Sequence, residues 1–294
     1  MDAQKVMTLK ECRLHIHEAL SKIYPKTEID SFFFLMIEEK LNLQRIDTVL
    51  KPNLLISQDN LTTFIKIIKR LQNEEPIQYI LKKTNFYGLP FIVDKNTLIP
   101  RPETEELVAW IIEEASKGKL HKKDKISILD IGTGTGCIPI SLAKNLIKSS
   151  VSAIDISQKA LLIAKKNALL NNTKIDFFEM DILNTESLPQ KFDIIVSNPP
   201  YVRELEKTGI KKNVLQNEPH LALFVDNNNP LLFYKKIADL AIKYLRKNGL
   251  LFFEINQYLE KETVKMLEMK GFKNIELRKD LFGNYRMIQC NNIL

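Results

Sequence analysis

The segment VSNPPYV, residues 196–202, places an amide, two prolines and a tyrosine directly after a run of apolar residues. Pro199 and Pro200 have no backbone N–H, so they stiffen the chain and leave the Pro199 carbonyl free to accept a hydrogen bond. The Asn198 side-chain oxygen and that carbonyl can together receive the two hydrogens of a planar NH2 group, and Tyr201 can pack against its π face. This pattern predicts a site that grips an amide or an exocyclic amine.

Two acceptors that bind an amide NH2 group in this way could activate its nitrogen for a reaction. An amide nitrogen is a poor nucleophile because it shares its lone pair with the carbonyl, the resonance that gives peptide bonds a rotation barrier of about 18–20 kcal/mol. Two acceptors outside the amide plane would favour a pyramidal nitrogen and stabilise the positive charge that develops on it. A sulfonium methyl group fits as the electrophile, because its own charge is relieved on transfer. We therefore expect methyl transfer, with Asn198, Pro199 and Tyr201 as catalytic residues.

A second set of residues has the chemistry of a nucleoside site. Gly132, Gly134 and Gly136 in ILDIGTGTG follow a strand pattern and open a helix pattern, where backbone N–H groups can approach a ligand closely. Asp155 ends the next strand pattern, where its carboxylate can accept hydrogen bonds from both ribose hydroxyls. The G-x-G-x-G spacing differs from the G-x-G-x-x-G dinucleotide fingerprint, which disfavours NAD without excluding it.

Asp181 ends the third strand pattern. In a parallel sheet it would lie beside the second strand, next to the adenine ring of a nucleoside whose ribose Asp155 holds. A lone aspartate at a strand end is also a common turn residue, and for Asp181 alone the turn is the better interpretation.

From Arg101 onward, strand patterns and helix patterns alternate along the sequence. These elements must position the residues described above. Apolar runs with the pattern of strands occur at residues 126–131, 150–156, 174–180, 192–198, 249–255, 274–280 and 285–290. Helical stretches such as 157–170 and 231–246 separate most of them, which predicts a parallel sheet covered on both faces, with ligands at the carboxyl ends of the strands. The last two runs have no helix between them, which predicts an antiparallel finish.

The N-terminal part has a different, helical texture. Thr8 and Glu11 form a capping box, and apolar residues then recur at helical spacing, with further stripes over 29–41 and 61–71. We expect a small bundle of about four helices, followed by short apolar runs typical of a β-hairpin. The predicted divisions are residues 1–82 for the helical domain, 83–100 for the hairpin linker and 101–294 for the methyltransferase domain.

Composition sets further limits. The chain has 294 residues, 45% of them hydrophobic, enough for two cores, and no run of about eighteen uncharged apolar residues, so we expect a cytoplasmic protein without a membrane partner. The formal charge of +7 is scattered, which favours a solvated face over a nucleic-acid site. Three widely spaced cysteines and four histidines without metal-ligand spacing predict neither a disulfide nor a metal site.

The motifs together resemble a known family. GTGTG, AIDIS and VSNPPYV are similar to the Rossmann-like S-adenosylmethionine-dependent methyltransferases that modify planar amino groups. The block at 74–108, which contains IPRPETE, and the segments NEPHLALF and FFEINQ narrow the resemblance to bacterial HemK-type peptide chain release factor glutamine methyltransferases. The resemblance covers essentially the whole chain. It implies an α/β fold, a mostly parallel class I methyltransferase sheet with an antiparallel finish and a small N-terminal helical bundle.

The resemblance also implies a reaction and its partners. Methyl transfer would run from S-adenosyl-L-methionine to the side-chain amide nitrogen of the glutamine in the Gly-Gly-Gln motif of class I release factors, supporting translation termination and leaving S-adenosyl-L-homocysteine. The helical domain would help to dock the protein substrate, with no stable nucleic-acid binding. The cofactor residues would be Gly132, Thr133, Gly134, Thr135, Gly136, Asp155, Asp181, Ile182 and Asn198. The residues that hold the glutamine would be Asn198, Pro199, Pro200 and Tyr201.

Two positions depart from the family pattern, and two more have open roles. Lys82 stands where the family has glycine, which affects the local turn, and Ile182 is aliphatic where some relatives carry an aromatic, which affects adenine stacking. Arg101 and Glu103 either line the cofactor or substrate entrance or cap the first helix of the catalytic domain. The sequence favours neither interpretation of this pair.

Two rival functions remain at this point. A nucleic-acid adenine or guanine amino methyltransferase uses the same tetrapeptide on a flipped base, but usually needs an extra recognition region. The residues after Tyr201 are expected nearly all to finish the sheet, which disfavours it. A non-catalytic S-adenosylmethionine-binding or docking protein is the second rival, and it has no use for an amide grip.

Overall fold

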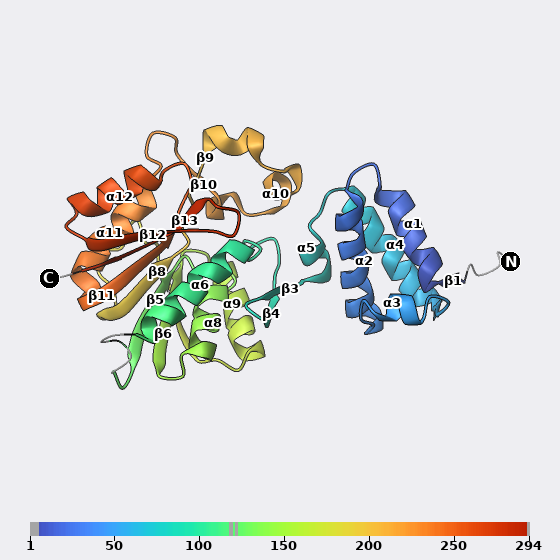
Figure 1. Ribbon diagram of the computed structural model, residues 1–294, viewed down its shortest axis with the longest axis horizontal. Coiled ribbons are helices and arrows are strands. Elements are labelled where there is room, and N and C mark those ends of the chain that lie inside the picture. Colours follow the sequence, from blue (N-terminus) through green and yellow to red (C-terminus); the bar gives the residue numbers. More distant parts are fainter. Residues whose placement is uncertain (1–5, 118–119, 121–122, 293–294) are drawn as a thin grey trace. The chain divides into compact units, whose positions relative to one another are not determined.

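The structure is a computed structural model that describes residues 6–117, 120 and 123–292 (Figure 1). One of the four histidines, His121, lies outside these residues. The chain divides into two compact units: the residues up to Lys82 together with Lys212–Asn217, and Lys83–Lys211 together with Glu218 and the residues after it. Over the described ranges, no helix combines the length and the apolar character needed to span a bilayer.

The first unit is a small helical bundle. Its elements are β1 (Met7–Thr8), α1 (Leu9–Leu20), α2 (Lys26–Leu41), α3 (Asp47–Leu50), β2 (Leu55–Ile56), α4 (Gln58–Gln72), α5 (Ile77–Leu81) and α10 (Lys212–Asn217). The predicted capping box starts α1: Thr8 Oγ1 accepts from the Glu11 N–H at 3.2 Å, and Glu11 Oε2 accepts from the Thr8 N–H at 2.8 Å. Helices α1, α2, α4 and α5 bury one apolar core, which includes Ile16, Phe33 and Phe64.

Lys82 caps α5 in the left-handed conformation, with φ of 58°. Its backbone N–H donates to the Gln78 carbonyl, as expected for a helix C-cap of this kind. Glycine adopts this conformation without steric cost, whereas a side chain with a Cβ does not. The departure at Lys82 therefore keeps the turn and adds backbone strain to it.

The second unit is built on a seven-stranded sheet. Its elements are β3 (Lys83–Phe86), β4 (Leu89–Ile92), α6 (Pro102–Ala115), β5 (Ile126–Ile131), α8 (Cys137–Asn145), β6 (Ser149–Asp155), α9 (Gln158–Leu170), β7 (Ile175–Glu179), β8 (Phe192–Ser197), β9 (Val202–Arg203), η1 (Glu204–Gly209), η2 (His220–Ala222), β10 (Phe224–Val225), α11 (Leu232–Tyr244), β11 (Leu245–Glu254), α12 (Glu260–Met269), β12 (Lys273–Lys279) and β13 (Tyr285–Asn291). The strand order is β7-β6-β5-β8-β11-β13-β12. The neighbouring strands β7, β6, β5, β8 and β11 pair in parallel. Strand β13 pairs antiparallel with both β11 and β12, which confirms the predicted antiparallel finish.

Helices cover both faces of this sheet (Figure 1). One face packs against α6 and α8 around Ile128, Val196 and Phe252. The other face packs against α11 and α12 around Leu129, Ile195 and Leu251. Consecutive residues of each central strand are thus buried on opposite faces, which explains the near-continuous apolar runs in the sequence.

The hairpin of β3 and β4 lies within the second unit. The buried Asn167 of α9 binds the edge strand β4 with its side chain: its Oδ1 accepts from the Ile92 N–H at 2.7 Å, and its Nδ2 donates to the Ile92 carbonyl at 3.0 Å. The same Nδ2 also donates to the Thr135 carbonyl at 2.9 Å. One amide therefore joins the hairpin to the end of the glycine-rich loop.

The expectation that nearly all residues after Tyr201 finish the sheet is wrong for 202–231. This segment leaves the sheet as β9, η1, α10, η2 and β10, with β9 and β10 forming a separate parallel pair. Within it, α10 belongs to the first unit: Lys212 Nζ lies 2.9 Å from Glu74 Oε2, and Asn217 Nδ2 donates to the Glu74 carbonyl at 3.4 Å. The prolines that follow β8 cannot donate to a ladder, so the strand cannot simply continue.

Candidate active site

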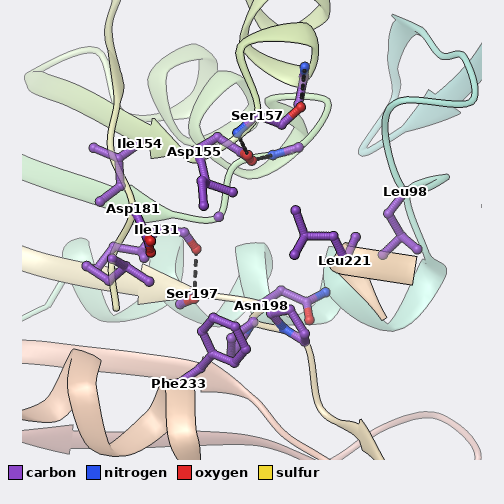
Figure 2. A pocket seen from close by; sticks show the side chains of 18 of the residues that line it. Leu98, Ile131, Ile154, Asp155, Ser157, Asp181, Ser197, Asn198, Leu221 and Phe233 are labelled. Carbon is purple, nitrogen blue, oxygen red and sulfur yellow. Dashed lines mark hydrogen bonds between the residues drawn. The ribbon is translucent and has the colours of Figure 1, made fainter. Parts of the chain in front are cut away.

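A cavity of about 230 Å³ lies in the second unit at the carboxyl ends of β5, β6 and β8 (Figure 2). The strand order reverses between β5 and β8, and such a switch point is where open α/β sheets bind ligands. Eight of the predicted site residues line it: Gly132, Gly134, Asp155, Asp181, Ile182, Asn198, Pro199 and Pro200. Four others do not line it: Thr133, Thr135, Gly136 and Tyr201.

Strand register brings the glycine loop and the asparagine loop together. Ile131 of β5 pairs with Ser197 of β8, and the Ser197 hydroxyl donates to the Ile131 carbonyl at 2.7 Å, as Figure 2 shows. Gly132 and Asn198 are the next residues on the two neighbouring strands. The two predicted loops therefore leave the sheet side by side.

The glycines of the loop have two different roles. Gly132 and Gly134 line the cavity with φ of 76° and 53°, conformations that favour glycine. Gly136 starts α8 with φ of 79°, and a Cβ there would lie 3.1 Å from both Ala164 Cβ and Ile140 Cδ1. Gly136 thus allows close packing behind the loop, and its predicted contact with the cofactor remains a prediction.

Asp155 is held in place by the backbone of its surroundings. Its Oδ2 accepts from the Gly134 N–H at 2.8 Å, and its Oδ1 accepts from the Ser157 N–H at 2.8 Å (Figure 2). Burial raises the pKa of Asp155, and these backbone hydrogen bonds, which favour the ionised form, oppose that rise. A carboxylate has about four acceptor positions, so Asp155 keeps acceptor capacity for hydroxyl groups of a ligand.

Asp181 and Ile182 combine the two roles considered for this strand end. The Asp181 carboxylate accepts from the Leu183 N–H at 2.9 Å and from Asn184 Nδ2 at 2.6 Å, as a turn residue does. Asp181 also lines the cavity. Ile182 is 8% exposed and, like Phe233, adds apolar surface to the cavity wall. Asp181 is therefore a turn residue that also lines the cavity, and its place beside an adenine ring remains a prediction.

Asn198 lines the cavity, and its side chain is hydrogen-bonded to a residue outside the cavity. Its Nδ2 donates to Thr104 Oγ1 of α6 at 3.3 Å, and Thr104 does not line the cavity. Tyr201 points elsewhere: its hydroxyl donates to Glu254 Oε1 at 2.9 Å. Burial, with the charge of Glu254, raises the pKa of Tyr201 well above its usual value, so the phenol stays protonated. The stacking role predicted for Tyr201 remains a prediction.

Sequence reasoning missed two buried carboxyl groups near the site. Glu254, 1% exposed, ends β11 and accepts from both Thr104 and Tyr201; burial raises its pKa, and these hydrogen bonds lower it. Asp130 is fully buried in β5, and neither of its oxygens has a hydrogen bond of good geometry among the described residues; burial raises its pKa to about 7, and the nearby Thr133 hydroxyl opposes that rise. The available signal was an acid within or at the end of an otherwise apolar strand pattern.

Arg101 and Glu103 do not line the cavity. Arg101 occupies the N-cap position of α6 without a side-chain cap bond, and its guanidinium pairs with Glu218 Oε1 at 2.7 Å. Glu218 Oε2 also accepts from the Ile99 N–H at 3.2 Å. Glu103 lies in the acidic first turn of α6, which favours a helix-terminal role. The capping interpretation fits Glu103, and Arg101 instead ties its segment to Glu218.

The chemistry of the cavity fits a nucleoside with a reacting group beside Asn198. Asp155 offers free acceptor positions at a strand end, Ile182 and Phe233 offer apolar surface, and Asn198 offers a polar side chain at the other side. Residues of this kind suit the ribose, adenine and reacting ends of S-adenosylmethionine.

Comparisons with known proteins point the same way. The sequence matches the model of a methyltransferase small domain over residues 117–223 and of the PrmC N-terminal domain over residues 14–81. It is 56% identical over 285 residues to the release factor glutamine methyltransferase of Flavobacterium psychrophilum, covering 97% of this chain and 99% of that protein. It is 41% identical to the enzyme of that name from Bacteroides thetaiotaomicron, covering 94% and 98%.

Solved structures add the fold. A human methyltransferase 10 domain containing protein superposes with a TM-score of 0.52 at 18% identity, covering 71% of this chain and 91% of that one. A methyltransferase from Pyrococcus furiosus gives a TM-score of 0.50 at 17% identity, covering 77% and 98%. At such identities the likeness concerns the fold alone.

Proposed function

The chain belongs to the family of release factor glutamine methyltransferases, and from that premise we propose that its cavity brings the methyl donor and the release-factor glutamine together at Asn198. The reaction is methyl transfer from S-adenosylmethionine to a glutamine of a release factor. The donor supplies a methyl group on a positively charged sulfur. The chain's own residues bind and orient the two reactants, because the transfer needs no nucleophile from the protein.

The single observation that carries the site assignment is the register of β5 and β8. It places Gly132 and Asn198 at the same edge of the sheet, bordering one cavity with Asp155. In the proposed arrangement Asp155 binds the ribose hydroxyls, and Ile182 borders the adenine. Gly132 and Gly134 form the floor of the donor site.

The acceptor end belongs to Asn198 and the two prolines. The Asn198 side-chain oxygen and the Pro199 carbonyl each accept one N–H of the glutamine amide, which turns the nitrogen lone pair toward the methyl group. As the bond from sulfur to the methyl carbon breaks and the bond from nitrogen to that carbon forms, positive charge grows on the nitrogen, and both oxygens stabilise it. The nitrogen then loses one N–H proton to solvent, and the neutral sulfide product leaves. Tyr201 holds the loop from behind through Glu254.

We further propose that the glutamine is that of the Gly-Gly-Gln motif of class I release factors and that the first unit helps to dock this substrate. The two units have separate apolar cores, and α10, the part of the first unit that a protein starting at Lys83 would keep, has no buried residues, so the second unit can be tested without residues 1–82. A protein starting at Lys83 should bind the donor but lose methylation of intact release factor. Full activity of that shortened protein would show that the first unit has another role.

The direct test is methyl transfer from radiolabelled S-adenosylmethionine to purified release factor. A release factor with Gln→Ala in its Gly-Gly-Gln motif, bulk DNA and bulk RNA serve as parallel acceptors. Label on the wild-type factor alone is the expected result. Label on the Gln→Ala factor would move the reaction to another residue, and label on nucleic acid alone would contradict the substrate.

A further inference from the structure

We propose that Thr104 and Glu254 are positioning residues that fix which end of the Asn198 amide faces the substrate. The inference deepens the proposed function, since it assigns the residues that set the acceptor group of the amide grip. Neither residue lines the cavity, so both act through Asn198 rather than on the substrate itself.

The Thr104 hydroxyl has a single proton to donate. Thr104 Oγ1 lies 2.6 Å from Glu254 Oε2, and the hydroxyl donates its proton to that oxygen. Thr104 is 2% exposed and Glu254 is 1% exposed, so water does not compete for this bond. With its proton committed, the hydroxyl can only accept from any other partner.

Asn198 is that other partner, and its geometry follows. The group that faces Thr104 at 3.3 Å must be the donor, Nδ2, because an oxygen there would meet only lone pairs. A side-chain amide has one oxygen and one nitrogen. Once its nitrogen is turned toward Thr104, the oxygen is the end left for the cavity. This is the orientation that an acceptor for a substrate NH2 requires.

Glu254 keeps the Thr104 hydroxyl proton turned toward it, because both carboxylate oxygens of Glu254 accept hydrogen bonds. Tyr201 donates to Oε1 at 2.9 Å and Thr104 donates to Oε2, so an ionised Glu254 has hydrogen bonds on each side. The guanidinium of Arg286 lies 5.9 Å from the centre of the Tyr201 ring, and its charge lowers the pKa of Glu254 against the effect of burial. A group that could donate toward Thr104 would free the threonine proton for Asn198.

Reversal of the amide would be costly for the reaction. The reversed side chain would present its NH2 to the NH2 of the substrate, so that two donors would face each other and the developing positive charge would lose an acceptor. A side chain free to adopt either orientation would lose about half of its productive population, and the lost restraint on its position would reduce the rate further. We expect a total loss of about tenfold in kcat.

The test compares Thr104→Val, Thr104→Ser and Thr263→Val. Valine keeps the shape of threonine and removes the hydroxyl, whereas serine keeps the hydroxyl. Thr263 is a matched control, because it is fully buried in the same unit and its hydroxyl donates to the Leu259 carbonyl at 2.7 Å, away from the cavity. The expected result is a fall of about tenfold in kcat for Thr104→Val alone, with unchanged donor affinity and kcat restored in Thr104→Ser.

A double-mutant cycle tests the link to Glu254. Glu254→Gln alone should lower kcat by a similar factor, because a glutamine can donate toward Thr104. In the Thr104→Val background the same change should add little, since the residue through which Glu254 acts is then absent. If the loss of kcat in the double variant equalled the product of the two single losses, Glu254 would not act through Thr104, and the proposal would be overturned.

A readout without substrate separates this proposal from the proposed function. The side-chain NH2 signal of Asn198 can be followed by NMR in protein labelled with [15N]asparagine and assigned by its disappearance in Asn198→Asp. Its hydrogens should exchange with solvent at least about tenfold more slowly in wild type and Thr104→Ser than in Thr104→Val. Equal exchange would overturn the positioning role even if release factor is methylated, and slow exchange would support it even if another substrate is used.

Discussion

Asn198→Ala gives the sharpest test of the amide grip, because its effects on stability and on turnover should differ widely. Among the residues that the structure describes, the Asn198 side chain makes one hydrogen bond, from Nδ2 to Thr104 Oγ1 at 3.3 Å. Its removal leaves the Thr104 proton paired with Glu254, so no buried donor loses its partner. The free energy of unfolding should therefore fall by only about 1 kcal/mol.

Turnover should respond much more strongly. The variant lacks one of two oxygens that stabilise charge in the transition state, and loss of one such partner costs about 10²–10³ in kcat, or roughly 2.7–4 kcal/mol. Donor affinity should change little, because Asp155 holds the ribose in the proposed arrangement. Single-turnover methyl transfer to release factor, calorimetric titration with S-adenosylmethionine and thermal unfolding measure the three quantities.

The exposed Asn228 of the same unit supplies a matched control. Asn228→Ala should leave kcat, donor affinity and melting temperature close to wild type. If Asn198→Ala kept near-normal turnover, Asn198 would have no part in the chemistry. If it lost donor binding as strongly as turnover, the side chain would belong to the donor site instead.

Asp155→Ala should weaken donor binding by about 10- to 100-fold, the loss of charge-assisted hydrogen bonds to the ribose, as measured by calorimetry. Gly136→Ala should lower the free energy of unfolding by about 2–4 kcal/mol, since it adds left-handed backbone strain to a Cβ placed 3.1 Å from Ala164 Cβ; urea unfolding measures it. Lys82→Gly should raise the free energy of unfolding by about 0.5–1 kcal/mol by relieving its positive φ, again by urea unfolding. Asp130, with a pKa of about 7, holds a proton in the folded state that the unfolded chain releases above about pH 4, so its contribution to stability is full at low pH and lost as pH rises through 7. Between pH 5 and pH 8, Asp130→Asn should therefore gain about 3 kcal/mol relative to wild type in paired urea titrations.

Each of these expectations has a result that contradicts it. An unchanged dissociation constant would remove Asp155 from the ribose site. Gly88→Ala is the control for Gly136, because its φ is 72° but nothing lies within 4 Å of the added Cβ; equal losses in the two variants would mean that packing behind the loop costs nothing. If Lys82→Gly lowered the free energy of unfolding, the positive φ of Lys82 would not be a source of strain. A constant gap between Asp130→Asn and wild type at the two pH values would show that the carboxyl titrates as in water.

The sheet and the cavity could be predicted because their signals are local. The run at 126–131 became β5 without change, and the run at 192–198 became β8 ending at Ser197, since strands buried on both faces are apolar throughout. Gly132 and Asn198 then follow from their places after those strands. Their meeting at one edge needs only the parallel pairing of the two strands.

What could not be predicted depends on contacts between distant segments. Thr104 and Glu254 occur within motifs that the sequence analysis quoted, but nothing local shows that a hydroxyl in one reaches a carboxylate in the other. Likewise α10 has no buried residues of its own, so no apolar period marks it as a helix of the first unit. The hydrogen bond from the Tyr201 hydroxyl to Glu254 joins two distant segments in the same way, and the predicted place of the Tyr201 ring beside the substrate remains a prediction.

The pairing of Ile131 with Ser197 limits where insertions and deletions can occur in enzymes with this fold. Because side chains alternate across a strand, inserting or deleting one residue in β8 would turn the following asparagine away from the cavity, whatever residue types were kept. The 202–231 segment lies outside the main sheet, so a change in its length would leave the register of β5 and β8 intact. A one-residue change within β8 would instead separate the donor loop from the acceptor loop.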